Sequence, residues 1–471
     1  MVKNIMKKTN RTSLEADKMD KLISLAKRRG FIFQSSEIYG GFGAYDYGPL
    51  GVELKNNIKR AWWRMFVTER PDMFGVDAAI IMHPRVWEAS GHLKNFSDAL
   101  VDCKKCHKRF RADHVLELEN LKPGFDKEKN KEPEKMICPE CGGELTAARQ
   151  FNLMFKTFIG PVEEEGSVSY LRPETAGGIF TNYKNILQAT RTKIPFGIAQ
   201  IGKAFRNEIT TENYIFRTRE FEQMEVEYFI HPKNWEKSFE QWQKLMEEWC
   251  AFLGIKKENL KLHEISDNDR AFYSKRTIDF EYEYPFGVKE LYGLAYRTDY
   301  DLSQHQKFSG EDLTYTDPES NEKFLPHVIE PSLGVDRSVL VALLEAYSEV
   351  AARSGEDDAK HETEVVLKLP YELAPIKVAI LPLSKKEPLI NLAKEIENDL
   401  RKTGLMIQYD ETGSIGKRYR RQDEIGTPFC VTVDFDSLED KKVTVRDRDT
   451  MQQERIAIED LGECLENKLR S

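Results

Sequence analysis

Two stretches of the chain carry charged and aromatic residues at spacings that suit the binding of a nucleotide. Residues 196–208 form an apolar run that ends in Arg206 and Glu208, and residues two apart on a strand project from the same face. Residues 217–230 alternate between an apolar and a polar face, and the polar face carries Arg219, Phe221, Gln223, Glu225 and Glu227. An antiparallel hairpin of these strands would offer guanidinium groups to phosphates, a ring to a base and a carboxylate to an exocyclic amine.

Two further segments carry charged residues close to glycines and could contribute to the same binding site. Residues 330–337 read Glu-Pro-Ser-Leu-Gly-Val-Asp-Arg and lead into an apolar helix. Gly334 permits close approach of the backbone, and Arg337 lies near the helix start, where an anion is favoured. Residues 170–180 place Glu174 shortly before two glycines.

Four of the seven cysteines form two Cys-x-x-Cys pairs, which are Cys103 with Cys106 and Cys138 with Cys141. This spacing is typical of a tetrahedral zinc site, and we predict one with a structural role. The alternative is a reduced loop without metal. Residues 115–136, which connect the pairs, are rich in Lys, Glu and Pro and predict an exposed excursion. The three single cysteines are expected to be buried apolar residues.

The elements that must position these residues precede and follow a predicted linker. Apolar residues at steps of four predict an amphipathic helix over 50–66, and the apolar run 77–84, which ends in proline, predicts an edge strand. A second helix is predicted over 234–253. Residues 351–364 are polar and lack periodicity, which indicates the linker.

Beyond the linker, predicted strands alternate with helices, which is typical of a small α/β domain. The strands are expected at 378–381, 405–409 and 429–435, with a helix at 389–400. A basic segment, Lys417–Arg421, is expected to be helical and lies between the last two strands. The part before the linker is expected to be an antiparallel sheet with helices.

Length and composition limit the class of protein. A chain of 471 residues is long enough for two to four domains, and 40% hydrophobic residues are too many for a disordered chain. The net charge of −9 argues against general basic binding of nucleic acid, so any RNA contact must use local patches. No secretory signal or membrane span is visible, and the protein is expected to be cytoplasmic.

In order along the chain, these motifs resemble the signatures of class II aminoacyl-tRNA synthetases. The hairpin resembles the second signature, Phe-Arg-x-Glu followed by a loop and Arg-x-x-x-Phe. Residues 334–337, Gly-Val-Asp-Arg, resemble the third signature, although Asp336 replaces the usual Glu. The helix at 50–66 and the strand at 77–84 resemble the first signature, which builds the dimer interface.

More specific strings resemble the homodimeric glycyl branch of that class. They lie at 110–114, 172–180, 219–225 and 329–334, and the resemblance extends from about Phe31 to the C-terminus. The resemblance implies a ligase that activates glycine with ATP to glycyl-adenylate, releasing pyrophosphate, and transfers glycine to the 3′-terminal adenosine of tRNA(Gly). It also implies Mg²⁺, a homodimer and no membrane partner.

The resemblance assigns site residues by position. Arg206, Arg337 and Glu290 are implied as catalytic, with Glu290 as a Mg²⁺ ligand. Arg206 is expected to hold the α-phosphate, Glu208 the adenine amine, and Phe221 the adenine ring, while Arg219 and Arg337 hold the outer phosphates. The ATP-binding set is Arg206, Asn207, Glu208, Phe216, Arg217, Thr218, Arg219, Glu220, Phe221, Glu290, Leu291, Gly334, Val335, Asp336 and Arg337. The glycine or substrate set is Arg111, Glu174, Phe221, Glu222, Gln223, Met224, Glu225, Arg297, Glu330, Pro331, Ser332, Leu333 and Gly334. Glu227 is left undecided.

The expected fold is an α+β catalytic domain with an antiparallel sheet, followed by an α/β anticodon-binding domain. The expected divisions are an N-terminal part of the catalytic domain (1–102), a zinc-ribbon-like insertion (103–145), the catalytic core (146–350, with a helical insertion at 231–285), a linker (351–365) and the anticodon-binding domain (366–471).

Two alternatives remain at this stage. One is a class II synthetase for another small amino acid, against which the carboxylate-rich pocket and the glycyl strings argue. The other is a non-catalytic RNA-binding or regulatory relative, against which the complete set of arginines and Glu290 argues. Amino-acid-dependent pyrophosphate exchange discriminates between all three.

Overall fold

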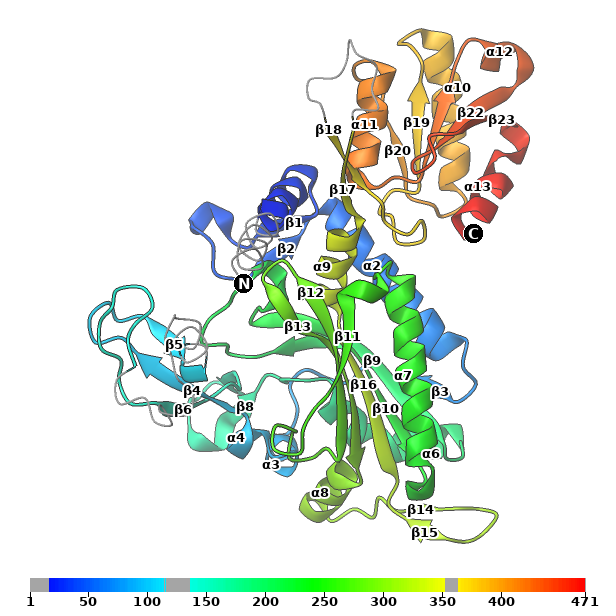
Figure 1. The fold of residues 1–471 in the computed structure, drawn as a ribbon. Coiled ribbons are helices and arrows are strands. Elements are labelled where there is room, and N and C mark those ends of the chain that lie inside the picture. Colours follow the sequence, from blue (N-terminus) through cyan, green and yellow to red (C-terminus); the bar gives the residue numbers. More distant parts are fainter. Residues whose placement is uncertain (1–16, 114, 116–135, 352–362, 471) are drawn as a thin grey trace, which may run out of the picture.

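The computed structural model describes residues 17–113, 115, 136–351 and 363–470. A large N-terminal body carries a smaller C-terminal domain at one end (Figure 1). Nearly all of the expected excursion at 115–136 and most of the expected linker at 351–365 lie outside the described residues. Within the described part of the chain, no helix is long and apolar enough to cross a membrane.

A seven-stranded sheet forms the centre of the N-terminal body. Its strand order is β11-β12-β13-β16-β10-β9-β3, and every pair is antiparallel except β3 with β9. The strands are β3 (Met73–Gly75), β9 (Phe196–Phe205), β10 (Glu220–Ile230), β11 (Leu260–Glu264), β12 (Arg276–Tyr284), β13 (Gly287–Thr298) and β16 (His327–Gly334). The predicted antiparallel hairpin is therefore confirmed as β9 and β10.

The strand order brings distant parts of the sequence together. Strand β16 pairs with β10 on one side and with β13 on the other, so that Glu225 and Gly293 are both register partners of Ser332. Segments 217–230 and 330–337, which are about a hundred residues apart, thus become neighbouring strands. The polar face of this central sheet can form one site.

Each face of the sheet is covered by its own helices. The face of Met224 and Val226 packs against α2 (Pro49–Trp63), α7 (Trp235–Phe252) and α9 (Val335–Ala346). The opposite face, with Phe229, packs against α6 (Ala176–Thr190) and α8 (Tyr300–Ser309). The short helix α3 (Arg85–Ala89) contacts both α6 and α8, and α4 (His92–Asn95) follows directly after it in the chain. Because the side chains of a strand alternate, the polar residues of β10 face α6 and α8.

Two expected elements differ from the structure. The edge strand expected at 77–84 is wrong, because the strand is β3, slightly earlier, and residues 77–84 form only the isolated bridge between Ile81 and Leu171. The side chain of Arg172 donates to the carbonyl of Ala78 at 2.7 Å, where a neighbouring strand would otherwise bind. The helical insertion expected at 231–285 is helical only in its first half.

The second half of that insertion extends the sheet. After α7 come the strands β11 and β12, and β12 buries every second residue, which are Ile278, Phe280, Tyr282 and Tyr284. This alternation is the pattern of a strand with one covered face. The insertion therefore belongs to the main core rather than standing apart from it.

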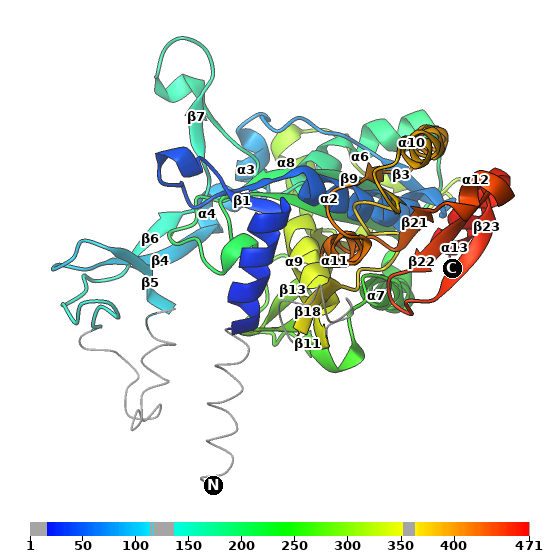
Figure 2. The same cartoon turned by 90° about the horizontal axis from the view of Figure 1, so that it is seen from above.

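The cysteine-rich part lies on the other side of the body from the C-terminal domain (Figures 1 and 2). It contains a three-stranded sheet of order β5-β4-β6, with β4 (Ser97–Asp102), β5 (Arg109–Arg111) and β6 (Arg149–Asn152). The smaller pairs are β1 (Ile32–Gln34) with β2 (Tyr45–Tyr47), β7 (Lys156–Phe158) with β8 (Val168–Tyr170), β14 (Tyr315–Thr316) with β15 (Lys323–Phe324), and β17 (Tyr347–Ala351) with β18 (Thr363–Leu367). A helix also covers residues 17–29.

The C-terminal domain is α/β, as predicted. Its five-stranded sheet has the order β20-β19-β21-β22-β23, in which β19 pairs in parallel with β20 and β21. The strands are β19 (Val378–Pro382), β20 (Ile407–Tyr409), β21 (Phe429–Val433), β22 (Lys442–Asp447) and β23 (Gln453–Ala457). The helices are α10 (Glu387–Arg401), α11 (Ile415–Ile425), α12 (Asp436–Asp440) and α13 (Leu461–Arg470).

This domain shares its core with the N-terminal body. Leu367, Leu369 and Ile425 belong to the same apolar cluster as the residues of α2 and α7. The side chain of Arg29 donates to the carboxylate of Glu424 at 2.6 Å, which ties the first described helix to α11. The two parts are therefore packed against each other rather than joined only by a linker.

Candidate active site

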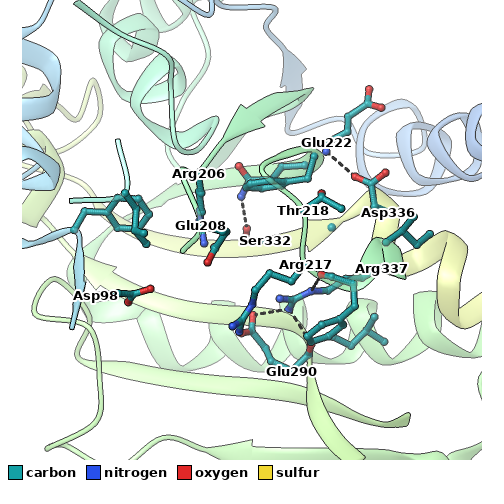
Figure 3. A pocket seen from close by; sticks show the side chains of 18 of the residues that line it. Asp98, Arg206, Glu208, Arg217, Thr218, Glu222, Glu290, Ser332, Asp336 and Arg337 are labelled. Carbon is teal, nitrogen blue, oxygen red and sulfur yellow. Dashed lines mark hydrogen bonds and ion pairs between the residues drawn. The ribbon is translucent and has the colours of Figure 1, made fainter. Parts of the chain in front are cut away.

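A cavity of about 320 Å³ lies at the end of the β9–β10 hairpin, beside the start of α9 (Figure 3). Its walls come from the hairpin, from β13 and β16, and from the cysteine-rich part. The lining residues are Phe96, Asp98, Arg111, Leu153, Arg206, Glu208, Ile215, Phe216, Arg217, Thr218, Phe221, Glu222, Gln223, Glu290, Leu291, Ser332, Gly334, Asp336 and Arg337. Both arginines of the expected catalytic set and Glu290 are among them.

Arg206 follows the last residue of β9 and is held by the backbone. Its amide donates to the carbonyl of Arg219 at 2.9 Å, and its Nε donates to the carbonyl of Pro173 at 3.1 Å. The guanidinium carbon lies 5.3 Å from the ring centres of both Phe96 and Phe221. A fixed cation beside two aromatic faces suits a phosphate next to a stacked base.

Glu208 presents a buried acceptor to the same cavity. Its Oε2 lies 4.0 Å from Arg111 and has no hydrogen-bond partner among the described residues. Burial raises the pKa of this carboxyl, although Arg217 and Arg206 oppose the shift. An unfilled acceptor inside an aromatic-lined cavity fits an exocyclic amine, which would satisfy it.

Arg337 stands at the mouth of the cavity in the first turn of α9. Its Nη1 donates to the carbonyl of Glu290 at 2.8 Å and lies 3.6 Å from the Glu290 carboxylate, and its guanidinium lies 4.4 Å from the ring centre of Phe216. The Glu290 side chain is half exposed. Nearby Asp279 has its pKa raised to about 7, first by burial and then by Glu290. The guanidinium of Arg337 could thus bind a polyphosphate, and the accessible carboxylate of Glu290 could bind the metal counter-ion of that polyphosphate.

Asp336 joins three structural elements. Its carboxylate accepts the amide of Glu222 at 2.8 Å and contacts Lys55 of α2 at 3.2 Å (Figure 3). The hydroxyl of Tyr47 donates to it at 2.5 Å. The shorter side chain that stands where the resemblance expects Glu therefore has a full set of partners.

Behind the cavity lies a chamber of buried carboxylates, which we call the acidic chamber and define as Glu174, Glu225, Glu227 and Glu330. All four side chains are at least nine-tenths buried. Glu225 accepts from Thr175 at 2.5 Å and from Ser332 at 2.7 Å. Ser332 and Gln223 line the cavity and also donate to Glu225, so the acidic chamber lies directly behind this part of the cavity wall.

One arginine balances part of this charge. Arg297, on β13, donates to both oxygens of Asp301 at 2.8 Å and to Glu330 at 2.6 Å. Its guanidinium also lies 3.9 Å from the ring centre of Tyr273. Both Arg297 and Asp301 are almost wholly buried, so this ion pair is shielded from water.

The carboxyl pKa values differ within the acidic chamber. Burial would raise that of Glu174, but His92, at 3.3 Å, and Arg297 bring it down to about 2. Burial raises the pKa of Glu330 to about 8 against the pull of Arg297. Burial and the neighbouring Glu174 raise that of Glu225, and burial and Glu330 raise that of Glu227 far above its usual value. Like charges at this distance cannot all ionise.

Several expected site residues lie away from the cavity. Glu220 is exposed and pairs with Lys203, and Arg219 donates to the carbonyl of Glu208. The backbone amide of Asn207 donates to the carbonyl of Leu153. Residues on the opposite face of the strands or in the core are Met224, Leu333, Val335 and Pro331, all of them buried.

The structure also brings in residues that sequence reasoning missed. Phe96, Asp98, Leu153 and Ile215 line the cavity, and nothing in their sequence surroundings marked them. Residues that contact the acidic chamber or its arginine are His92, Thr175, Tyr273 and Asp301, and the charge of Arg172 acts on Glu225. The sequence could have indicated two of these residues by their position, since Thr175 directly follows Glu174 and Asp301 lies four residues after Arg297.

The two cysteine pairs come together as predicted. All four sulfurs lie within 4.8 Å of one another, with 3.5 Å between Cys103 and Cys141 and 3.7 Å between Cys106 and Cys138. The amides of Lys105 and Cys106 donate to the Cys103 sulfur, and the Cys106 amide is the main reason why the Cys103 pKa falls to about 6. Of the single cysteines, Cys250 and Cys430 are buried and Cys464 is half-buried.

Comparison with known proteins gives two family matches. Residues 156–347 match the family described as tRNA synthetase class II core domain (G, H, P, S and T), and residues 377–468 match the family described as anticodon binding domain. The chain is 53% identical to the glycine–tRNA ligase of Treponema denticola, over 96% of this chain and 97% of that protein. It is 55% identical to that of Acetivibrio thermocellus (96% and 98%) and 53% identical to that of Thermobifida fusca (97% and 99%).

Proposed function

Because this chain belongs to the glycine–tRNA ligases of the class II aminoacyl-tRNA synthetases, we propose that the cavity binds ATP and the acidic chamber binds glycine. The reaction activates glycine with ATP to glycyl-adenylate, releases pyrophosphate, and transfers glycine to the 3′-terminal adenosine of tRNA(Gly). The observation that carries the assignment is that Gln223 and Ser332 line the cavity and at the same time donate to Glu225 of the acidic chamber.

On the ATP side, the ring of Phe221 takes the adenine and Glu208 accepts its amine. Arg206 then lies beside the α-phosphate, and Arg337 takes the outer phosphates at the cavity mouth. The glycine carboxylate attacks the α-phosphorus in line with the departing pyrophosphate. Positioned cations lower the barrier because charge develops on the phosphate oxygens where they already stand.

On the glycine side, the ammonium group enters among carboxylates. Glycine offers only its ammonium, its carboxylate and its small size for recognition. Its ammonium donates charge-assisted hydrogen bonds, which the carboxylates of Glu174, Glu225 and Glu330 accept. Size exclusion of alanine contributes about 1–3 kcal/mol for one methyl group. Arg297 keeps Glu330 in place through its 2.6 Å bond.

The test is amino-acid-dependent exchange of pyrophosphate into ATP. Glycine supports exchange, and alanine, serine and proline support little. Arg206→Ala abolishes it, while Arg401→Ala, an exposed arginine on α10 in the other domain, leaves it unchanged. Exchange that is equal with serine or proline would point to another small amino acid, and an inert wild-type protein would point to a non-catalytic relative.

Two metal ions fit the residues present. Glu290, with Asp279 close by, offers oxygen ligands beside the outer phosphates, and Mg²⁺ bound there would neutralise phosphate charge. The four cysteines fit Zn²⁺, because a tetrahedral site with bonds of about 2.3 Å puts sulfurs about 3.8 Å apart. The 3.5 Å and 3.7 Å separations lie close to that value, and the role is structural.

We assign anticodon recognition to the C-terminal domain. Two arginines of its basic segment have partners inside the domain: Arg418 is buried and donates to the carbonyl of Pro382 at 2.5 Å, and Arg421 binds Asp410. Lys417 is exposed, and Lys417→Glu is expected to slow tRNA charging without changing pyrophosphate exchange. Equal loss of both activities would contradict this division.

The same proposal includes a cytoplasmic homodimer. Strand β3 ends the main sheet, and α2 lies near it, so this edge is the place where a second copy would pack. The free cysteines fit a reducing compartment. Sedimentation analysis at micromolar concentration tests the dimer, and a monomer at all concentrations would reject it.

A further inference from the structure

Glu227 is the member of the acidic chamber that has no role in the proposed activation of glycine. It lies on β10, two residues deeper than Glu225, and its side chain is completely buried. Neither of its oxygens has a hydrogen-bond partner in the described structure. One of them lies within 4.8 Å of oxygens of both Glu225 and Glu330.

The positively charged side chains near Glu227 are engaged by other groups. Arg297 is taken up by Asp301 and Glu330, and His92 faces Glu174. Arg172 donates to the backbone carbonyls of Lys203 and Ala78. The charged and titratable groups that face the acidic chamber are Glu174, Glu225, Arg297, Asp301, Glu330, His92, His305, Tyr273 and Arg172.

In this surrounding the carboxyl groups outnumber the positive charges. A fully buried carboxylate without hydrogen bonds is far less stable than the neutral acid, since an ion loses its hydration in a medium of low polarity. Three carboxyl groups in mutual contact also share their protons, so the proton belongs to the group rather than to one residue. Burial and neighbouring carboxylates raise the pKa of Glu225, Glu227 and Glu330 alike.

We propose that glycine binds by exchange for a proton: its ammonium group enters between Glu225 and Glu330, and the proton that these residues share with Glu227 leaves to solvent. The step balances, because the protein loses one proton and gains one ammonium charge while no covalent bond of glycine changes. Glu227 is thus a positioning residue for the known reaction, and this inference rests on the proposed assignment of glycine to the acidic chamber.

The proton exchange would let the acidic chamber discriminate between ligands by their charge. A ligand of the same size without an ammonium group, such as glycolate, has no positive charge to replace the proton and would leave the carboxyl groups protonated. Selection for glycine then depends on its charge as well as on its size. It also makes glycine affinity depend on pH, because each proton released strengthens binding up to tenfold per pH unit.

Calorimetric titration of the full-length protein with glycine tests the exchange. At pH 7, in phosphate and in Tris, whose ionisation enthalpies differ, the difference in heat gives the number of protons released. We expect about one proton per glycine at pH 7, and a dissociation constant that falls by up to about tenfold per pH unit between pH 6 and pH 8. Glu227→Gln should at least halve the proton count and flatten the pH dependence.

The matched control is Glu345→Gln, whose carboxylate accepts from Asn259 and Tyr282 away from the acidic chamber. It should release protons as the wild type does. Glycine binding without proton release by the wild type, which needs no variant to fold, would overturn the inference and leave the proposed function standing. So would an unchanged proton count in Glu227→Gln, or release of the same protons by Mg²⁺ alone. Failure of glycine to bind at all would instead reject the proposed function.

Discussion

Replacing Asp301 by Asn removes the charge that holds Arg297 in the acidic chamber. The carboxylate of Asp301 accepts two bonds of 2.8 Å from Arg297, and both side chains are at least 98% buried. The amide has nearly the same shape, so the substitution removes charge without leaving a cavity. The amide oxygen would still accept one of these bonds, but Glu330 would be the one charged partner that Arg297 keeps from this group.

The expected cost follows from burial. An exposed ion pair contributes less than about 1 kcal/mol, but removal of one partner of a buried pair costs about 3–5 kcal/mol, because the remaining charge stays in a medium of low polarity. If unfolding in urea has a slope of about 3 kcal/mol per molar, the midpoint should fall by roughly 1–1.7 M. The KM for glycine should also rise, because Glu330 loses its alignment.

Urea unfolding followed by tryptophan fluorescence measures the first effect, and pyrophosphate exchange measures the second. The control is Asp299→Asn, two residues away at the start of the same helix, where the carboxylate is half-buried and accepts from Ser303 at 2.9 Å. It should cost less than about 1 kcal/mol. If Asp301→Asn costs no more than its control, the buried pair does not organise the acidic chamber and the reasoning fails.

Three further predictions concern other parts of the molecule. Arg337→Ala should lower kcat/KM for ATP in pyrophosphate exchange by about 10²–10³-fold, as removal of one transition-state donor does, while calorimetric glycine binding without ATP persists; a loss of glycine binding would contradict its place at the outer phosphates. Cys141→Ser should lower the zinc measured by mass spectrometry of the purified protein, whereas Cys464→Ser should not, and equal zinc in both would reject the four-cysteine site. Folding raises the carboxyl pKa of Glu227 above its usual 4.5, so this group contributes stability below pH 4.5 that is lost as pH rises. In urea unfolding, the stability of Glu227→Gln relative to wild type should therefore increase between pH 5 and pH 8. A stability difference that does not change with pH would show that Glu227 has an ordinary pKa.

The sequence predicted the elements whose pattern is local. The alternation in 217–230 identified β10 and separated its two faces, and the steps of four in 50–66 identified α2. Alternation says which residues share a face, but it does not say what covers that face. Glu227 remained undecided for this reason, since its environment depends on α6 and α8, which are remote in sequence.

Local patterns miss contacts between segments that are distant in sequence. Residues 77–84 are apolar enough for a strand, but the Arg172 side chain binds the carbonyl of Ala78. The helix predicted at Lys417–Arg421 is confirmed as part of α11, but its charge pattern does not show that Arg418 is buried and donates to the carbonyl of Pro382.

The shared core has a consequence for how the chain is made. The apolar cluster that begins with Met19 and Leu22 is completed by Leu369, Ile376 and Ile425, about 400 residues later. At a synthesis rate of about 5–20 residues per second, roughly 20–80 s pass before the last of these residues leaves the ribosome. The early helices expose apolar surface during that interval and need protection from aggregation. A chain that stops before residue 425 would carry an unfinished core, rather than a complete catalytic domain without its neighbour.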